Sequence, residues 1–318
     1  MRPYRGRFAP SPTGKLHLGG AATALCAWLA ARSAGGELVL RVEDIDTPRV
    51  VPGALESILD DLRWLGLDWD EGPDVGGPCD PYVQSARTAR YDQAIARLEA
   101  DGQVYSCDCS RAEIARVASA PHGEEGPIYP GLCRTASATR SFRRPPAIRL
   151  RTGHHILAFE DLVHGPIQED LASQAGDFVL RRGDGIFSYQ LAVVVDDLAM
   201  GITDVVRGAD LLSSTARQIA LAERLGGVPP RFAHAPLVIG PEGSRLAKRA
   251  PGVALRDHRE NGTDPRIVVA LLARILGLGE PHAQRIEPRD LIDRFAWNRI
   301  RRSPVAVDAR ELVVVGES

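Results

Sequence analysis

Fourteen residues near the start of the chain constrain its fold more than any other stretch. They read Arg7-Phe-Ala-Pro-Ser-Pro-Thr-Gly-Lys-Leu-His-Leu-Gly-Gly20, and an alanine-rich run over residues 21–34 follows them. Because two prolines and three glycines exclude regular structure here, we predict a fixed turn between a short strand over residues 5–9 and a helix that begins near Leu18. Such a strand, turn and helix are typical of the nucleotide-binding edge of a parallel α/β sheet.

The beginning of that helix has the properties of a phosphate site. Its first N–H groups have no partner within the helix and carry a partial positive charge. Gly19 and Gly20 leave bare backbone that a purine or a phosphate can approach. His17, just ahead of them, can donate a hydrogen bond to a phosphoryl oxygen.

His-Leu-Gly-Gly preceded by Ala-Pro-Ser-Pro-Thr-Gly resembles the first signature of class I aminoacyl-tRNA synthetases, in the form found in glutamyl-tRNA synthetases. An ordinary strand–helix turn explains a lone glycine-rich turn, but not a match of this length. The resemblance implies an α/β fold with a Rossmann-type parallel sheet, a zinc-containing α+β insertion and a helical C-terminal region that contacts the tRNA stem. It also implies an ATP-binding set, which this chain carries as Pro10, His17, Gly19, Gly20, Arg245, Leu246 and Lys248.

Composition sets broader limits. With 318 residues, 44% of them hydrophobic and 25% charged, the chain reads as a soluble globular protein of two or three domains. Its apolar stretches are too short to span a membrane and its N-terminus lacks an apolar signal region, so we expect a cytoplasmic monomer without a membrane partner. The net charge of −2 does not itself indicate a polyanion partner, although a local basic face could bind one.

Residues 37–43, Glu-Leu-Val-Leu-Arg-Val-Glu, read as a buried parallel strand that ends in acidic residues. Since ligands of open α/β sheets collect at the carboxyl ends of strands, Glu43, Asp44 and Asp46 should lie beside the His17 loop. For Asp46, ahead of Pro48, helix capping is at least as good an interpretation. The resemblance implies that Glu43 helps to hold the α-amino group of the amino acid.

A second half of the same fold is indicated by residues 187–197, with an apolar centre, and by residues 205–210, which end a second strand. The resemblance implies a pocket for L-glutamate formed by Arg7, Ala9, Ser11, Glu43, Tyr189 and Arg207. A dicarboxylic amino acid needs cations for its carboxylates, and bidentate arginine suits them. Arg7 and Arg207 both fall at predicted strand–loop junctions, although arginine is frequent throughout this chain.

Three of the five cysteines, Cys107, Cys109 and Cys133, fall within 27 residues and follow no helix or strand period. An odd number of cysteines in a chain without an export signal argues against disulfides, so a structural metal or plain burial is the better interpretation. Zinc normally takes four ligands, and on chemical grounds His122 is the first choice for the fourth.

The resemblance suggests Tyr129 instead. Cys-x-Cys followed by Tyr-x₃-Cys is similar to the zinc signature of glutamyl-queuosine tRNA(Asp) synthetases, short relatives of glutamyl-tRNA synthetases. It implies one structural Zn²⁺ held by Cys107, Cys109, Tyr129 and Cys133. Three buried cysteines without a metal remain the alternative.

Residues 245–249, Arg-Leu-Ala-Lys-Arg, resemble the second class I signature, Lys-Met-Ser-Lys-Ser. Arginine replaces the first lysine and Ala247 replaces the serine hydroxyl, but Lys248 keeps the essential charge. Only Lys15 and Lys248 are lysines among the 39 basic residues. A GC-rich coding sequence explains the general preference for arginine, and a need for a compact ammonium group at these two positions is the functional interpretation. We therefore expect activity, with a less constrained loop closure.

Two helices are predicted in the last part of the chain, over residues 264–276 and 288–300, with an arginine-rich edge. That edge is either a solvated face or a contact for tRNA phosphates. The chain ends at Ser318, which leaves no room for the anticodon-binding region of glutamyl-tRNA synthetases. We predict a catalytic domain over residues 1–104 and 187–240, an insertion over 105–186, and a signature loop with a stem-contact region over 241–318.

The implied reaction is attack of a glutamate carboxylate on the α-phosphorus of ATP, with Mg²⁺ bound mainly by ATP. His17 and Lys248 are the predicted catalytic residues, because charge gathers on the phosphate oxygens and no Ser/His/Asp or Cys/His nucleophile competes. The zinc pattern and the chain's length favour queuosine of tRNA(Asp) as the acceptor. The alternatives are a truncated glutamyl-tRNA synthetase that charges tRNA(Glu) and an inactive tRNA- or zinc-binding paralogue, whose support is Ala247.

Overall fold

A six-stranded sheet forms the centre of the protein in the computed structural model, which describes residues 2–117, 128–136, 140–153, 156–240, 242–243, 253–280 and 283–307. The strand order is β2 (Glu37–Leu40), β1 (Arg5–Phe8), β8 (Asp204–Gly208), β9 (Arg231–Ala235), β5 (Ile156–Asp161) and β6 (Gly165–Asp170). The first five strands are parallel, and β6 is antiparallel to β5. The predicted parallel α/β sheet is therefore confirmed.

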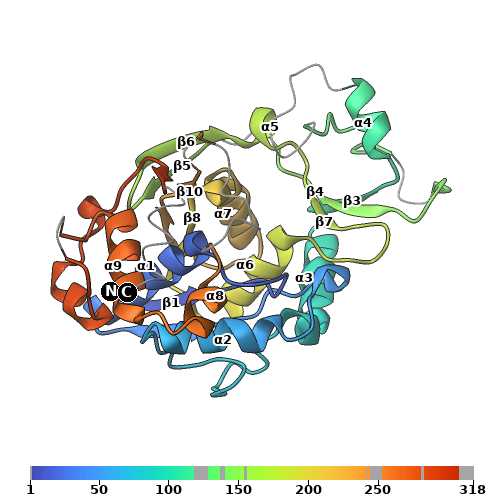
Figure 1. Ribbon diagram of the computed structural model, residues 1–318. Helices are drawn as coiled ribbons and strands as arrows, with labels where there is room; N and C mark the ends of the chain where they lie inside the picture. The colour runs from blue at the N-terminus through green and yellow to red at the C-terminus, as the bar shows by residue number, and fades with distance from the viewer. Residues whose placement is uncertain are drawn as a thin grey trace.

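The alanine-rich run forms α1 (Leu18–Ser33), which begins where the sequence predicts. Small side chains let this helix lie deep in the protein, where it contacts β1 and β8 on one side and α9 (Pro265–Leu276) on the other. Figure 1 shows α1 at the centre, between the sheet and the C-terminal helices. Its N-terminal end consequently faces the carboxyl ends of β1 and β8, where parallel sheets bind ligands.

Other helices surround this core. One of them is α2 (Ala54–Trp64), and the apolar centre of the run over residues 187–197 lies within α6 (Tyr189–Ala199). Alongside α6 pack α3 (Thr88–Ala100) and α7 (Thr215–Arg224), and α8 (Leu255–Glu260) packs on α2. Short 3₁₀ turns connect these elements: η1 (Thr47–Arg49), η2 (Gln84–Arg87) and η3 (Ala209–Ser214).

A separate three-stranded antiparallel sheet lies within the predicted insertion, in the order β3 (Val104–Cys107), β4 (Ala147–Leu150) and β7 (Val179–Arg181). Figure 1 shows α4 (Arg111–Val117) extending beyond this sheet, away from the central one. The β5–β6 hairpin, which α5 (Leu171–Gln174) follows, falls between residues 105 and 186 but belongs to the central sheet, because Asp161 pairs with Phe232 of β9. The domain boundaries themselves remain a prediction.

The helix predicted over residues 288–300 is wrong. This segment forms two short 3₁₀ turns, η4 (Pro288–Arg294) and η5 (Trp297–Arg299), separated by extended backbone at Phe295 and Ala296. Phe295 and Trp297 stack edge to face, with ring centroids 4.9 Å apart, and both pack against the core. A continuous helix would separate these two rings, so packing overrides the helical pattern. The predicted helix over residues 264–276 is confirmed as α9.

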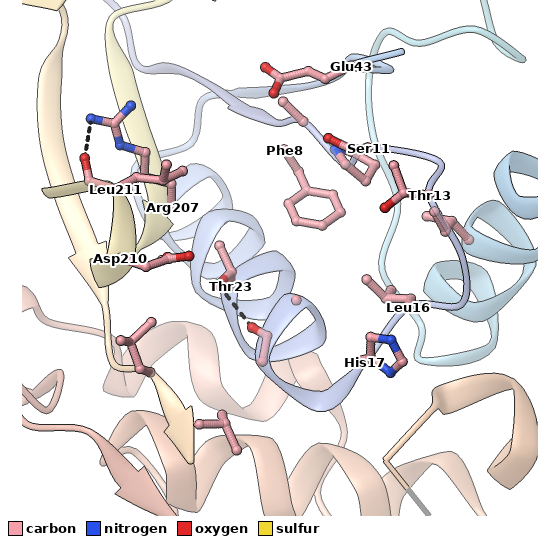
Figure 2. Close-up of a pocket in the computed structure, with 18 of the residues that line it drawn as sticks. Phe8, Ser11, Thr13, Leu16, His17, Thr23, Glu43, Arg207, Asp210 and Leu211 are labelled. Atoms are coloured by element: carbon pink, nitrogen blue, oxygen red, sulfur yellow. Dashed lines mark hydrogen bonds between the residues drawn. The ribbon is translucent and has the colours of Figure 1, made fainter. Parts of the chain in front are cut away.

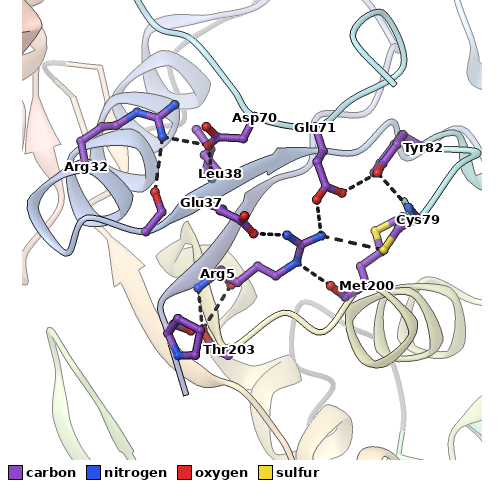
Figure 3. A network of polar contacts seen from close by, with 12 residues as sticks. Arg5, Arg32, Glu37, Leu38, Asp70, Glu71, Cys79, Tyr82, Met200 and Thr203 are labelled. Carbon is purple, nitrogen blue, oxygen red and sulfur yellow. Dashed lines mark hydrogen bonds and ion pairs between the residues drawn. The ribbon is translucent and has the colours of Figure 1, made fainter. Parts of the chain in front are cut away.

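Polar contacts fix the outer end of β1, two residues before Arg7. The Arg5 side chain pairs with Glu37 and with Glu71, the latter at 2.7 Å, and its Nε donates to the Met200 carbonyl oxygen at 2.7 Å. Figure 3 shows this arginine at the junction of three segments, with Tyr82 donating to the other oxygen of Glu71. The network therefore ties β1 to β2, to the loop ahead of α3 and to the end of α6.

Within the described part of the chain, every helix is too short or too polar to cross a membrane. Near the C-terminal end of the described residues, β10 (Val238–Ile239) pairs with β11 (Val305–Ala306). This pairing joins the segment before the second signature to the residues that follow η5.

Candidate active site

A cavity of about 630 Å³ opens at the carboxyl ends of β1 and β8, beside the first turn of α1. Figure 2 shows Ser11, Thr13 and His17 on one side of it, Arg207 and Asp210 on the other, and Phe8 between them. All ten of the described residues that were predicted to bind glutamate or ATP line this cavity: Arg7, Ala9, Pro10, Ser11, His17, Gly19, Gly20, Glu43, Tyr189 and Arg207.

Backbone hydrogen bonds hold the loop from β1 to α1 in place. The Glu43 N–H donates to the Pro10 carbonyl oxygen at 3.0 Å, and the Val51 N–H donates to that of Pro12 at 2.9 Å. His17 occupies the position before the helix, with extended backbone at φ −104° and ψ 164°. The loop is therefore built against the end of β2, which brings Glu43 beside it as predicted.

Gly19 and Gly20 face the cavity without side chains that would fill it. A Cβ atom at Gly19 would lie 3.8 Å from the Val238 side chain, which is ordinary contact, so the absence of a side chain there keeps space open rather than avoiding a clash. A Cβ atom at Gly20 would lie 2.8 Å from Leu16 Cδ1 and would displace that side chain. Both glycines thus preserve the shape of the cavity at the helix terminus.

The second signature, with Arg245, Leu246, Ala247 and Lys248, lies outside the described residues, so its predicted roles remain predictions. Residues on either side of it are described. Ile239 before it and Val253 after it both line the cavity beside His17.

Arg207 is almost completely buried, at 4% exposure, and all five of its N–H groups have acceptors. Nε donates to His234 Nε2 at 3.0 Å, and one terminal nitrogen donates to Gln218 Oε1 at 2.6 Å and weakly to Tyr189 Oη at 3.4 Å. The other terminal nitrogen donates to the Leu211 carbonyl oxygen at 3.1 Å and to Thr215 Oγ1 at 2.8 Å.

None of these five acceptors carries a charge, and no described carboxylate lies within ion-pair distance of Arg207. Burial lowers the pKa of Arg207 from its ordinary value, but a guanidinium stays charged under all physiological conditions. The cavity therefore has at its wall a buried cation whose direct hydrogen-bond partners are all neutral, while Asp197 acts on its pKa from beyond ion-pair distance.

Glu43, which also lines the cavity, belongs to a buried ionic network. Its carboxylate accepts from Arg41 at 3.2 Å, and Arg41 also pairs with Asp197 at 2.7 Å. Asp197 lies 3.6 Å from Arg7, and Asp196 pairs with Arg87 at 2.6 Å. Burial raises the pKa of Glu43, and the charges of Arg41 and Arg7 oppose that rise.

Sequence reasoning missed Arg41, Asp196 and Asp197 as supports of the site. The sequence does carry a signal for the two aspartates, because they come directly after an apolar run. Acidic residues next to such a run are seldom buried unless a cation pairs with them. It gives no comparable signal for Arg41 in a chain so rich in arginine.

A second cavity of about 290 Å³ adjoins the first and shares Ser11, Thr13, Glu43 and Tyr189 with it. Charged residues of both signs line its outer part, among them Asp46, Arg49 and Arg182. Asp44 also lines it, but its carboxylate accepts from the backbone N–H and the hydroxyl of Ser85 at 2.8 and 2.6 Å. The Asp44 carboxylate is therefore already engaged in a local structural contact.

The three clustered cysteines meet in the insertion, where their sulfur atoms lie within 4.8 Å of one another and all three are free thiols. Tyr129 Oη lies 3.3 Å from Cys107 Sγ and 3.9 Å from Cys109 Sγ. With Zn–S bonds of about 2.3 Å, tetrahedral ligand atoms are roughly 3.8 Å apart, so this set fits a zinc ion. His122 lies outside the described residues.

Charged groups surround this cluster. Arg149 stacks over the Tyr129 ring, 3.9 Å from its centroid, and Arg140 donates to Cys133 Sγ at 3.2 Å. Burial raises the pKa of Cys109 to about 12, whereas for Cys107 hydrogen bonds from Tyr129 and Arg149 outweigh burial and lower the pKa of the thiol. The surrounding cations suit an anionic metal–thiolate centre.

Comparisons with known proteins agree with this geometry. The family model described as tRNA synthetases class I (E and Q), catalytic domain, matches residues 4–313. A protein of Symbiobacterium thermophilum named glutamyl-Q tRNA(Asp) synthetase is 50% identical, over 98% of this chain and 98% of its own length. A glutamate–tRNA ligase of Heliobacterium modesticaldum is 41% identical over 98% of this chain, but over 64% of its own length.

Among solved structures, a glutamate tRNA ligase from Elizabethkingia meningosepticum in complex with its amino acid superimposes with a TM-score of 0.84. The two are 29% identical over 99% of this chain and 69% of the other. The family model and the relatives together cover both halves of the central sheet and the insertion between them. The chain therefore belongs to the class I tRNA synthetases of the E and Q type.

Proposed function

We propose that this protein activates L-glutamate with ATP and transfers it to the queuosine base of tRNA(Asp). The observation that carries the activation step is the buried charge of Arg207, whose direct partners are all neutral, in a cavity that also contains Arg7 and Glu43. Two cations and one anion at one end of a cavity complement the two carboxylates and one ammonium group of glutamate. Relatives named for this activity match the chain from end to end, which supports the acceptor.

In this proposal Arg207 and Arg7 bind the substrate carboxylates and Glu43 binds the α-amino group. Tyr189, whose hydroxyl accepts weakly from Arg207, is close enough to shift its contact toward the same carboxylate. Ala9 and Ser11 form the wall between the amino acid and the nucleotide. Because both arginines are fixed before substrate binds, little ordering is needed on binding.

ATP then occupies the part of the cavity beside α1, against Pro10, Gly19 and Gly20. His17 donates to a phosphate oxygen from one side, and Lys248, with Arg245 and Leu246, acts from the other. The described residues on both sides of the second signature line this cavity, which supports that role. Of the described lining residues, only Glu43 and Asp210 are carboxylates, so Mg²⁺ is held mainly by the phosphates of ATP.

The chemistry of activation requires no protein nucleophile. A glutamate carboxylate oxygen bonds to the α-phosphorus, the bond from that phosphorus to the bridging oxygen breaks, and pyrophosphate leaves. Negative charge gathers on the phosphate oxygens, where His17, Lys248 and the α1 terminus stabilise it. The acceptor base reaches the adenylate through the second cavity, which opens beside Glu43 and Tyr189.

A structural zinc ion completes the proposal. Cys107, Cys109 and Cys133 supply three sulfur ligands and Tyr129 supplies the fourth through its hydroxyl oxygen. With four protein ligands the site is closed, so the metal holds the insertion together rather than taking part in the reaction.

An acceptor assay tests this function. The protein is incubated with ATP, labelled glutamate, and either queuosine-bearing tRNA(Asp) or unmodified tRNA(Glu). We expect label on tRNA(Asp) alone. Label on tRNA(Glu) alone would support the alternative of a glutamyl-tRNA synthetase, the activity for which a relative 41% identical to this chain is named. The absence of glutamate-dependent pyrophosphate exchange without tRNA would instead indicate an inactive paralogue.

A further inference from the structure

Behind the cavity, a chain of three buried side chains crosses three neighbouring strands. Arg207 of β8 and His234 of β9 face each other in register, and Asp161 of β5 lies on the far side of the imidazole. His234 and Asp161 are 0% and 1% exposed. None of the sequence patterns singles out His234 or Asp161, and neither lines the cavity.

The hydrogen bonds fix the proton positions along this chain. A guanidinium can only donate, so His234 Nε2, 3.0 Å from Arg207 Nε, must be the unprotonated ring nitrogen. The ring proton is therefore on Nδ1, which lies 2.5 Å from Asp161 Oδ2. The histidine is neutral and in a single tautomer.

Asp161 is itself held firmly in place. Its other oxygen accepts from the backbone N–H groups of Val163 and His164 at 3.0 and 2.8 Å. Burial alone would raise the pKa of Asp161, but the hydrogen bonds from His234 and from the backbone lower it. Asp161 therefore stays negatively charged, and the side chains of His234 and Arg207 separate it from the cavity.

We propose that Asp161 and His234 are positioning residues that orient Arg207 for the substrate carboxylate. This proposal rests on the proposed function, in which Arg207 binds glutamate. A carboxylate placed directly on Arg207 would compete with the substrate for its hydrogen-bonding edge. The neutral imidazole instead takes Nε and transmits the orientation that Asp161 sets, and the remaining N–H groups also meet neutral acceptors. The guanidinium therefore keeps its charge for an incoming anion, which takes over the weak 3.4 Å contact with Tyr189.

Three substitutions at His234 separate this role from a merely structural one. His234→Gln places an amide oxygen near the position of Nε2 and keeps an acceptor for Arg207. His234→Asn places its amide near Nδ1 and keeps only the contact with Asp161. His234→Phe removes both contacts at similar size. The readout is the KM for glutamate and for ATP in tRNA-independent pyrophosphate exchange, with thermal unfolding measured in parallel.

We expect the KM for glutamate to rise about 10-fold or more in His234→Asn and His234→Phe, because a hydrogen bond to a charged group is lost. In His234→Gln it should stay within about 3-fold of the wild type. The KM for ATP should not change. Equal effects of the Asn and Gln variants on glutamate, or a parallel rise in the KM for ATP, would overturn the proposal.

Asp161→Asn provides a second test that leaves the histidine in place. The nitrogen of the new amide can donate a hydrogen bond to His234 Nδ1 but cannot accept one. The ring proton then favours Nε2, where it faces the N–H of Arg207 and removes the acceptor for that group. We expect a rise in the KM for glutamate as large as that of His234→Phe. A KM that stays at the wild-type value in this folded variant contradicts the relay.

Tyr105→Phe is the matched control, because it removes another buried hydrogen bond, 2.6 Å long, to Asp177 in the insertion. It should lower stability and leave both KM values unchanged. If the wild-type protein shows no glutamate-dependent exchange, the proposed function fails. If the wild type is active and the His234 and Asp161 variants match it, only the positioning role fails.

Discussion

The backbone N–H of Leu18 donates to the carbonyl oxygen of Val253 at 3.1 Å. The Leu255 N–H donates back to the carbonyl oxygen of Leu16 at 2.9 Å, which completes an antiparallel bridge between His17 and Ala254. These bonds join the residues around His17 to the chain directly after the second signature. Because the Leu18 N–H is already used, the N–H groups of Gly19 and Gly20 are the nearest helix donors for a phosphate.

This arrangement predicts a large effect of Lys248→Ala. Loss of the ammonium group should reduce glutamate-dependent pyrophosphate exchange by about 100-fold or more, since it removes a charge that stabilises the transition state. The matched control is Arg256→Ala on α8, which removes an exposed cation paired with Glu260. Exchange rates of both variants, with circular dichroism to verify folding, provide the measurement. Unchanged exchange in Lys248→Ala would remove the second signature from the mechanism.

Arg207→Gln should weaken glutamate binding specifically. A charged hydrogen bond contributes about 1.5–3 kcal/mol, so we expect the KM for glutamate to rise about 10- to 150-fold while the KM for ATP is unchanged. Arg224→Gln on α7 is the control, because that half-buried arginine donates to the Thr152 carbonyl oxygen away from the cavity. Equal KM values for glutamate in the two variants would argue against a substrate role for Arg207.

Metal analysis tests the zinc site. We expect one zinc per chain in the purified protein, loss of zinc in Cys133→Ser, and faster release to a chelator in Tyr129→Phe. Cys79→Ser is the control, since Cys79 is a half-buried free thiol outside the cluster. Metal content and release rate are measured by atomic emission and a colorimetric chelator. Wild-type release kinetics in Tyr129→Phe would exclude the tyrosine as a ligand.

Stability should depend on pH through His234. Burial lowers the pKa of this histidine, and the facing Arg207 and His164 lower it further, whereas Asp161 opposes them. The unfolded chain therefore binds a proton near pH 6.5 that the folded protein does not, so the free energy of unfolding falls as the pH drops below about 6.5. Urea denaturation at pH 7 and pH 5 should show a smaller fall in His234→Gln than in the wild type. Identical falls would contradict this assignment.

The sequence predicts the first half of the site well because its residues are contiguous. The end of a strand, a turn and the start of a helix follow one another between Arg7 and Gly20, so these residues can be assigned to one site from the local sequence alone. The parallel sheet follows from alternating apolar strands and helices in the same way. The cytoplasmic location and the monomeric state remain predictions.

What the sequence does not reveal are contacts between distant strands. His234 meets Arg207 only because β8 and β9 are neighbours in register, and Asp161 joins them only because the β5–β6 hairpin adds to the same sheet. The helix predicted over residues 288–300 is wrong for a related reason, since two aromatic rings take their places on the core instead. Tertiary packing decides both cases.

The buried charge of Arg207, which has no carboxylate as a direct partner, has a practical consequence for handling the protein. Acetate, citrate or sulfate at the concentrations used in storage and crystallisation buffers would enter the cavity and neutralise the guanidinium. Such anions would raise the melting temperature while they compete with the amino acid. In those buffers the measured KM for glutamate would be too high. A zwitterionic buffer that contains little chloride and no carboxylate would give the true value.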